Sequence, residues 1–510
     1  MTAHRTAAGT HSVSAAAMQA RTPELLMLVP HEPTLDPRIH YTANTLAKEY
    51  RVTVLATVRD FERRPADNYP SAPLYETTRI AYRHQRGLAA ARDFLNLRGA
   101  AADGTLARLR ARVGSALGLA VASSVFIGLG FGERAIHWRR LQLSGPRPVA
   151  PEGALPRAVP APAGTGLRSL LAISRYALQA SGLLWQHIID NGLRPDIVYC
   201  HDLYALQAAV LLKRRTHCPV IYDSHEYFPY QAQGAAYERT VRWYERALVR
   251  EVDLYLTVSP QLAEELQSVY GVKQVHVFPN VEPRPPTQPK VIPGEMHRLA
   301  DGRLKILYQG SFAPQRGLEE IVADWSRVDG GRAALFLRGP PNSTLDGLKG
   351  LAQESGLLDK SIYVLPPVLE RDLITAAAEA DIGLIPYKND QPSYRFACPN
   401  KLSQYIHASL AIISNNIPFV TQLLEEHGIG EVYDARQPGS FAGAVRSMYE
   451  DPKTLAACRA KAKALSNGDY TWEHYEPRLL DLVRELGAQD RPLRKGSQAT
   501  STRLERRHEP

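Results

Sequence analysis

Residues 380–415 carry a strand, a polar loop, a helix and a second strand, in that order. The apolar run Ile382–Ile385 predicts a buried strand, and a helix is expected to begin at Pro399 and Asn400 after a loop rich in Asn, Asp and Pro. The run Leu410–Ser414 predicts the second strand. A helix that begins after a parallel strand presents free N–H groups and a positive dipole end. The segment therefore predicts a parallel sheet with an anion site at its edge.

The same alternation of apolar runs and helical spacing occurs twice, which predicts two doubly wound, Rossmann-like α/β domains. Strands of the first series are expected at 25–29, 52–56, 196–200, 220–222, 254–258 and 275–278. Strands of the second series are expected at 304–309, 333–338, 361–364, 381–385 and 410–414. Ligands of open α/β sheets bind outside the carboxyl ends of the strands, so we expect the two domains to face a cleft lined by these ends.

The chain of 510 residues is 44% hydrophobic and 22% charged, which is typical of a globular protein with several domains. A Pro-rich stretch separates the two series. The predicted parts are a disordered leader at 1–23, an N-terminal domain at 24–282, a linker at 283–300, a C-terminal domain at 301–470, a terminal helix at 471–487 and a disordered tail at 488–510. The leader has no apolar core typical of a secretory signal.

A helical insert is predicted at 85–190, with a Pro/Ala-rich linker at 145–166. It contains the apolar run Ala116–Phe131, which as a helix would span about 24 Å, less than the roughly 30 Å of a hydrocarbon core. Arginines flank the run on both sides. We therefore predict peripheral membrane contact through 108–140, and the alternative is an ordinary buried helix pair.

The net charge of +9 favours polyanionic partners, but the cations lack the aromatic interleaving of a nucleic-acid-binding module, so no nucleic-acid partner is expected. The four Cys residues form no C-x-x-C pair. Neither a zinc site nor a disulfide framework is therefore indicated, and a reducing compartment is expected.

Three loops follow strands of the second series and suit a diphosphate. The loop after 304–309 holds Gly310 and Ser311, with Arg316 near the start of the next helix, and the loop after 333–338 holds Gly339. Glycine lets the backbone approach a ligand, and arginine is a forked phosphate ligand. Lys401, on the third loop, adds a second cation. These features predict a diphosphate site.

Polar clusters also follow strands of the first series. They comprise Asp36 and Arg38, then His201 and Asp202, then His225 and Glu226. A lone histidine is more often structural, but two histidine–carboxylate clusters on neighbouring loops favour a functional site. The chain has no G-x-G-x-x-G after its first strand, no P-loop and no D-x-D run. We therefore expect no nicotinamide cofactor, no ATPase chemistry and no metal.

Four motifs together resemble a known family. They are the segments 196–206 (DIVYCHDLYAL), 219–229 (PVIYDSHEYFP), 307–318 (LYQGSFAPQRGL) and 399–402 (PNKL). In this order they resemble the retaining glycosyltransferases of family 4, which have the GT-B fold. The resemblance covers about residues 24–60 and 193–487. It implies transfer of a sugar from a nucleotide diphosphate donor with retention at the anomeric carbon.

The resemblance, together with the loops at the strand ends described above, suggests roles for individual residues. The catalytic candidates are His201, Arg316 and Lys401. The donor-binding candidates are Gly310, Ser311, Gly339, Pro399, Asn400, Leu402 and Gln404. The acceptor-binding candidates are Asp36, Arg38, Asp202, His225 and Glu226. In this interpretation the C-terminal domain binds the nucleotide sugar and the N-terminal domain binds the acceptor.

The chain departs from the family at three positions. Phe396 and Gln404 stand where members often have two glutamates, and Ser311 stands where many have arginine. These departures imply either an altered donor specificity or a loss of activity. The predicted function is a metal-independent hexosyltransferase of cell-surface polysaccharide or glycolipid synthesis, in the cytoplasm at the inner membrane face. The alternatives are a degenerate protein that binds a nucleotide sugar without turnover and a nucleotide-sugar epimerase.

Overall fold

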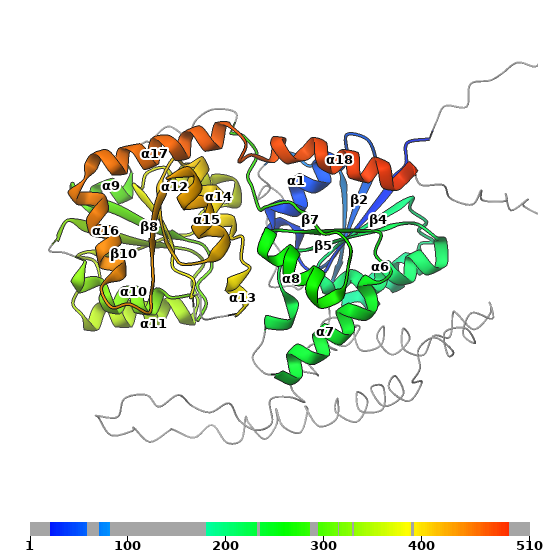
Figure 1. The fold of residues 1–510 in the computed structure, drawn as a ribbon, viewed down its shortest axis with the longest axis horizontal. Coiled ribbons are helices and arrows are strands. Elements are labelled where there is room, and N and C mark those ends of the chain that lie inside the picture. The colour runs from blue at the N-terminus through cyan, green and yellow to red at the C-terminus, as the bar shows by residue number, and fades with distance from the viewer. Residues whose placement is uncertain are drawn as a thin grey trace, which may run out of the picture.

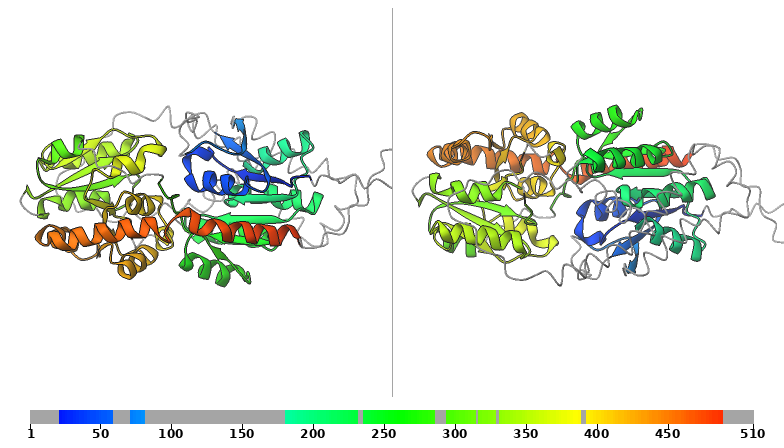
Figure 2. Two further views of the ribbon diagram at one scale, coloured as in Figure 1. Left: turned by 90° about the horizontal axis from the view of Figure 1, so that it is seen from above. Right: turned by 90° about the horizontal axis from the view of Figure 1, so that it is seen from below.

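The computed structural model describes residues 21–58, 71–81, 180–231, 235–285, 294–314, 316–328, 331–388 and 392–488. These residues form two α/β domains, each built on a parallel sheet with helices on both faces (Figures 1 and 2). Of the predicted insert, residues 85–179 lie outside the described part, and residues 180–190 are helical. The predicted membrane segment 108–140, the linker 145–166 and most of the leader and tail also lie outside it.

The N-terminal sheet has seven parallel strands in the order β3-β2-β1-β4-β5-β6-β7. Its strands are β1 (Glu24–Val29), β2 (Arg51–Val58), β3 (Glu76–Ala81), β4 (Ile197–His201), β5 (Val220–Ser224), β6 (Leu254–Thr257) and β7 (His276–Val277). Its helices are η1 (Pro33–Leu35), α1 (Pro37–Leu46), α6 (Leu203–Thr216), η5 (Phe228–Tyr230), α7 (Ala235–Val249) and α8 (Pro260–Tyr270). The central strands β1, β4 and β5 are almost wholly buried because helices cover both faces.

The C-terminal sheet has six parallel strands in the order β10-β9-β8-β11-β12-β13. Its strands are β8 (Leu304–Gln309), β9 (Ala333–Arg338), β10 (Ile362–Leu365), β11 (Ile382–Ile385), β12 (Ala411–Asn415) and β13 (Gly430–Tyr433). Its helical elements are α9 (Glu295–Ala300), α10 (Leu318–Asp324), η6 (Trp325–Arg327), α11 (Ser343–Glu354), η8 (Glu370–Asp372), α12 (Leu373–Ala377), α13 (Pro392–Arg395), α14 (Asn400–His407), α15 (Pro418–His427), α16 (Ser440–Glu450) and α17 (Pro452–Asn467). The prediction of two doubly wound domains is confirmed.

Two edge strands, β3 and β13, have no counterpart among the predicted strands. Most of their residues are only partly buried, so their sequences lack the continuous apolar run by which the inner strands are recognised. The short helix α9 lies within the stretch predicted as a linker and packs against β8. His201 and Asp223 belong to strands β4 and β5 themselves, which extend one and two residues beyond the predicted ends.

The last helix, α18 (Trp472–Ala488), leaves the C-terminal domain and lies along the N-terminal domain beside α1 (Figure 1). The Trp472 indole donates to the Thr45 hydroxyl at 2.7 Å. Between the domains, the Ser259 hydroxyl donates to the Phe396 carbonyl at 3.0 Å, and the Asn280 amide donates to the Cys398 carbonyl at 2.8 Å. These bonds bring the loops that follow strands of both sheets together.

Candidate functional site

Two glycine loops of the C-terminal domain meet at the carboxyl end of β8. Gly310 has φ +132°, and its N–H donates to the Arg338 carbonyl at 2.9 Å. A Cβ on Gly339 would lie 2.0 Å from the Gly310 carbonyl oxygen, so only glycine fits there. A Cβ on Gly310 would lie 3.6 Å from Lys401 Nζ. The backbone at Gly310 therefore lies beside the amine of the third predicted loop.

Helix α14 is positioned by Tyr405. Its ring lies against Gly383 of β11, where an added Cβ would be 2.3 Å from the ring, and its hydroxyl accepts from the Gln309 N–H at 2.9 Å. The hydroxyl also donates to the Leu307 carbonyl at 3.1 Å. These contacts hold α14 close to β8. The first turn of α14, at Asn400 and Lys401, therefore lies next to the loop at Gly310.

Two cations meet at the Tyr387 hydroxyl, which follows β11. Lys401 Nζ lies 2.7 Å from this oxygen, and Arg316 Nη1 lies 3.1 Å from it. Lys401 is 5% exposed and also lies over the rings of Tyr308 and Tyr387. Among the described residues, neither cation forms a salt bridge with a carboxylate. Burial and the neighbouring Arg316 lower the pKa of Lys401 well below its usual value. Two close cations without a counter-ion favour an anionic ligand.

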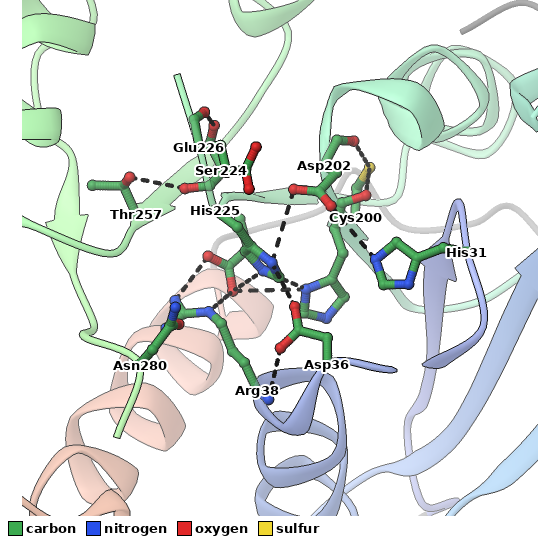
Figure 3. A network of polar contacts seen from close by, with 12 residues as sticks. His31, Asp36, Arg38, Cys200, Asp202, Ser224, His225, Glu226, Thr257 and Asn280 are labelled. Atoms are coloured by element: carbon green, nitrogen blue, oxygen red, sulfur yellow. Dashed lines mark hydrogen bonds and ion pairs between the residues drawn. The ribbon is translucent and has the colours of Figure 1, made fainter. Parts of the chain in front are cut away.

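The polar cluster of the N-terminal domain surrounds His225 (Figure 3), and the Asp223 carboxylate lies 3.6 Å from His225 Nε2. The Arg38 guanidinium is bidentate to Asp223, at 2.8 and 2.9 Å, and Tyr199 donates to the same carboxylate at 2.8 Å. His225 Nδ1 lies 2.9 Å from Asp36 Oδ2. His225 Nε2 lies 3.0 Å from His201 Nδ1. The loops after β1 and β5 and the end of β4 thus build one connected network.

The network separates the pKa values of its two histidines. Burial opposes the charge on His225, but the carboxylates of Asp202, Asp223 and Asp36 raise its pKa well above 6.5. Burial, and then the charge on His225, lower the pKa of His201 to about 3. Although burial raises it, the charges of Arg38 and His225 hold the pKa of Asp223 well below its usual value. We therefore expect a charged His225 beside a neutral His201.

His201, Asp223 and His225 place their ligand atoms within 4.8 Å of one another, which raises the question of a metal ion. Their contacts do not suit one. Both Asp223 oxygens already accept hydrogen bonds from Arg38, and His225 uses both ring nitrogens. The Arg38 guanidinium would also repel a cation at this point. The donor set of this cluster therefore does not fit a metal.

Asp202 has a backbone conformation that is rare outside glycine, with φ 63° and ψ 156°. Its carboxylate lies 3.7 Å from His31 Nε2 and 3.8 Å from His225 Nδ1. The conformation places a carboxylate directly after His201, at the start of α6.

Phe396, at the position where family members often have a glutamate, packs across the domain boundary. It is 8% exposed and packs against the rings of Tyr227 and Tyr230, with centroids 5.5 and 6.5 Å away. Gln404, at the second such position, is also buried and donates to Glu282, which accepts from Tyr41 as well. Burial raises the pKa of Glu282 to about 7. Both side chains therefore contribute to contacts between the domains.

The packing of Phe396 leads to a stability prediction. Phe396→Ala should lower the free energy of unfolding by about 3 kcal/mol, because it leaves a cavity among aromatic rings. Phe396→Glu should lower it further, because a carboxylate would be buried without a partner. Phe396→Leu serves as the control and should cost less than alanine. Denaturant titration measures all three variants. A glutamate variant as stable as the wild type would mean that this side chain faces solvent.

The structure brings most of the predicted site residues into these two neighbouring groups. The C-terminal group holds Gly310, Ser311, Arg316, Gly339, Pro399, Asn400, Lys401 and Leu402. The N-terminal group holds Asp36, Arg38, His201, Asp202 and His225, and Glu226 accepts from Gln231 beside them. Burial raises the pKa of Glu226, and the charge of Arg316 opposes this rise, so the two side chains lie near each other. Arg38 is buried, and its guanidinium donates hydrogen bonds to both oxygens of Asp223. It therefore supports the site by holding Asp223 in place.

Four residues of these groups are absent from the predicted site: Asp223, His31, Tyr199 and Tyr387. Asp223 has a usable signal, since a carboxylate inside an apolar run such as VIYDS needs a buried partner. The sequence gives no comparable signal for Tyr199 and Tyr387, because tyrosine is common in protein cores.

Solved structures share this architecture. The structure aligns with sucrose-phosphate synthase from Thermosynechococcus elongatus at a TM-score of 0.59, with 13% identity over 92% of this chain and 100% of that one. It aligns with Anabaena HepE in complex with UDP and glucose at a TM-score of 0.59, with 10% identity over 91% of this chain and 100% of that one. These similarities identify the GT-B fold, in which two Rossmann-like domains face each other.

Sequence comparisons point to the same class. Residues 106–281 match the family model of the glycosyl transferase 4-like domain. The glycogen synthase of Mycobacterium tuberculosis is 22% identical over 316 residues, which cover 59% of this chain and 72% of that protein. The uncharacterised glycosyltransferase YqgM of Bacillus subtilis is 23% identical over 217 residues, which cover 41% of this chain and 57% of that protein. The family model and both relatives point to the family 4 glycosyltransferases as the class that this chain resembles.

Proposed function

We propose that this protein is a retaining glycosyltransferase that moves a hexosyl group from a nucleotide diphosphate sugar to a polysaccharide or glycolipid acceptor, without a metal ion or other cofactor. The observation that carries the proposal is the pair Arg316 and Lys401, which meet beside the Gly310 loop without a carboxylate partner among the described residues. A diphosphate supplies the missing negative charge. The crystallised relative HepE contains UDP and glucose, which supports this donor class.

In this proposal the two cations and the first turn of α14 stabilise the diphosphate as it leaves, since its negative charge grows in the transition state. Arg316 and Lys401 would take the place that a metal ion has in other nucleotide-sugar sites. The donor phosphate would accept the proton of the incoming hydroxyl. His201 would contact the transferred sugar, while His225 and Glu226 would lie toward the acceptor.

A screen of nucleotides by thermal unfolding tests the donor site. We expect one of the uridine, guanosine or adenosine diphosphates to stabilise the protein, by about 2.7 kcal/mol at about 100 times its Kd. Inorganic phosphate, which lacks the nucleoside, is the control and should have a smaller effect. If no diphosphate and no nucleotide sugar shifts the unfolding temperature, the donor site is misassigned.

The packing of Phe396 against Tyr227 and Tyr230 favours the second candidate function, a protein that binds a nucleotide sugar without turnover, because an apolar ring occupies the position of the glutamate. The third candidate function is nucleotide-sugar epimerization. A turnover assay with the donor identified by the screen separates them. Sugar transfer, retained as the same anomer in the product, supports the proposed transferase. Binding alone supports the second candidate.

We also propose that the protein works in cell-surface polysaccharide synthesis in the cytoplasm, at the inner membrane face. No helix among the described residues is long and apolar enough to cross a bilayer. One described surface fits peripheral contact: Arg239, Trp243 and Arg246 lie on one face of α7. Trp243 is 67% exposed, and neither arginine forms a salt bridge with a described residue. Exposed tryptophan beside unpaired arginines suits an anionic lipid surface.

We expect the protein to sediment with vesicles that contain phosphatidylglycerol and not with pure phosphatidylcholine vesicles. Arg239→Glu with Arg246→Glu should weaken binding at least about tenfold, because each cation near the surface contributes about 1 kcal/mol. Arg298→Glu with Arg327→Glu, an equal charge change in the C-terminal domain, is the control. Deletion of 108–140 tests the predicted segment separately. Unchanged sedimentation in both the α7 variant and the deletion would contradict membrane contact at either place.

A further inference from the structure

The contacts of His225 restrict where its protons lie. Nδ1 is 2.9 Å from the Asp36 carboxylate, which can only accept, so Nδ1 carries a proton. Nε2 is 3.0 Å from His201 Nδ1, so one of these two nitrogens must donate to the other. Two arrangements satisfy this geometry. Either a doubly protonated His225 donates to His201, or His201 donates to a neutral His225.

The charges around His225 favour the first arrangement. Three carboxylates lie within 4 Å of its ring nitrogens, those of Asp36, Asp202 and Asp223. Arg38 neutralises one of them through its bidentate contact with Asp223. His31, 3.7 Å from Asp202, can neutralise a second. A proton on His225 neutralises the third, whereas a neutral His225 would leave a buried carboxylate without a counter-charge.

This arrangement fixes the tautomer of His201. Since His201 Nδ1 accepts from His225, its single proton lies on Nε2. The side chain of His201 is fully buried, and its Nε2 has no hydrogen-bond partner among the described residues. An unpaired buried donor is destabilising, and a ligand oxygen in contact with it would remove that cost.

We propose that His225 is a positioning residue that holds His201 as a hydrogen-bond donor, so that His201 Nε2–H binds an oxygen of the bound sugar instead of acting as a general base. The inference rests on the proposed transferase function for the identity of that oxygen. The predicted tautomer of His201 does not depend on a bound ligand. Asp36 and Asp223 act through His225, and Tyr199 and Arg38 hold Asp223 in place.

Nitrogen-15 NMR of the histidine rings in the whole, ligand-free protein tests the tautomer directly. We expect His201 to be protonated at Nε2 alone and His225 at both nitrogens near neutral pH. His201→Gln and His225→Gln assign the signals by their loss. In Asp36→Asn, His225 should lose its second proton at a lower pH than in the wild type. A His201 ring protonated at Nδ1 would overturn the inference, and this readout does not depend on catalysis.

Two isosteric variants test the role of the donor. Glutamine places its amide near the position of Nε2, and asparagine places it near Nδ1. His201→Gln should therefore keep kcat/KM within about tenfold of the wild type, and His201→Asn should lose at least about tenfold more. Equal losses in both variants, or a larger loss in glutamine, would contradict donation through Nε2. If the wild type transfers no sugar, the proposed function fails while the NMR result still decides the tautomer.

Discussion

Replacing Lys401 by methionine should lower the turnover of sugar transfer at least about tenfold and leave the ligand-free protein no less stable. The Lys401 amine is buried against two tyrosine rings, beside Arg316, and no described carboxylate pairs with it. Methionine fills the same space without the buried charge, so the free protein is relieved of a desolvation cost. The bound diphosphate loses a charged hydrogen bond in exchange.

The measurement is turnover together with thermal unfolding, with and without nucleotide. Lys388→Met is the matched control, because Lys388 lies in the loop that contains Tyr387 but pairs with Glu320. The control should keep wild-type turnover and nucleotide stabilisation. Arg316→Ala should resemble Lys401→Met in turnover. Wild-type rates in both Lys401→Met and Arg316→Ala would show that the cation pair does not hold the diphosphate.

The lowered pKa of Lys401 adds a pH dependence. Burial and Arg316 lower the pKa of this lysine in the free protein, below its ordinary value of 10.5. Between the pKa of Lys401 in the folded protein and its ordinary value of 10.5, the unfolded chain binds more protons than the folded one. The free energy of unfolding therefore rises with pH in this range. A bound anion restores the charge, and nucleotide binding should therefore take up a proton in this window. Calorimetry in buffers of different ionisation enthalpy measures the uptake, which Lys401→Met should abolish.

Breaking the buried ion pair between Arg38 and Asp223 should lower the free energy of unfolding by about 3–5 kcal/mol. The two side chains are 2% and 0% exposed and are joined by two hydrogen bonds. Arg38→Met leaves the Asp223 carboxylate buried beside Asp36, and Asp223→Asn leaves the guanidinium without its counter-charge. The double variant should cost less than the sum of the two, because it removes both charges.

Denaturant unfolding at neutral pH measures these variants. Arg214→Met is the control, because its partner Glu251 lies at the surface, and it should cost less than about 1 kcal/mol. The Asp223 pKa is held below its ordinary value by Arg38 and His225 despite burial. Its stabilising contribution is therefore present above about pH 4 and is lost as the pH falls through the folded pKa. A small cost for both single variants at neutral pH would mean that the pair is hydrated.

The elements themselves could be predicted to a large extent from the sequence. The strands at 304–309 and 333–338 have the predicted ends, because buried parallel strands are continuous apolar runs bounded by glycine or charge. The positions of the loops at Gly310, Gly339 and Asn400 could also be predicted, since the carboxyl ends of parallel strands meet at one edge. The edge strands β3 and β13 could not be predicted, because a half-exposed strand has no continuous apolar run.

The contacts within the site depended on tertiary structure. Arg38 was expected to face an acceptor, but it is buried on Asp223, from which it is separated by 185 positions in the chain. The partner of a charged side chain so far away in sequence leaves no trace in local spacing. The pairing of His201 with His225 is of the same kind, because it requires β4 and β5 to be neighbours in register.

By itself the sequence determined that the chain forms two parallel α/β domains with glycine and cation loops at the strand ends, because periodicity and turn chemistry are local properties. Only the tertiary structure decided that Lys401 and Arg316 share the Tyr387 hydroxyl with no carboxylate partner among the described residues. It also decided that Phe396 packs against Tyr227 and Tyr230, and that three carboxylates surround His225. Charge states and tautomers follow from distances between groups on different elements. Those distances exist only once the sheets and domains have assembled.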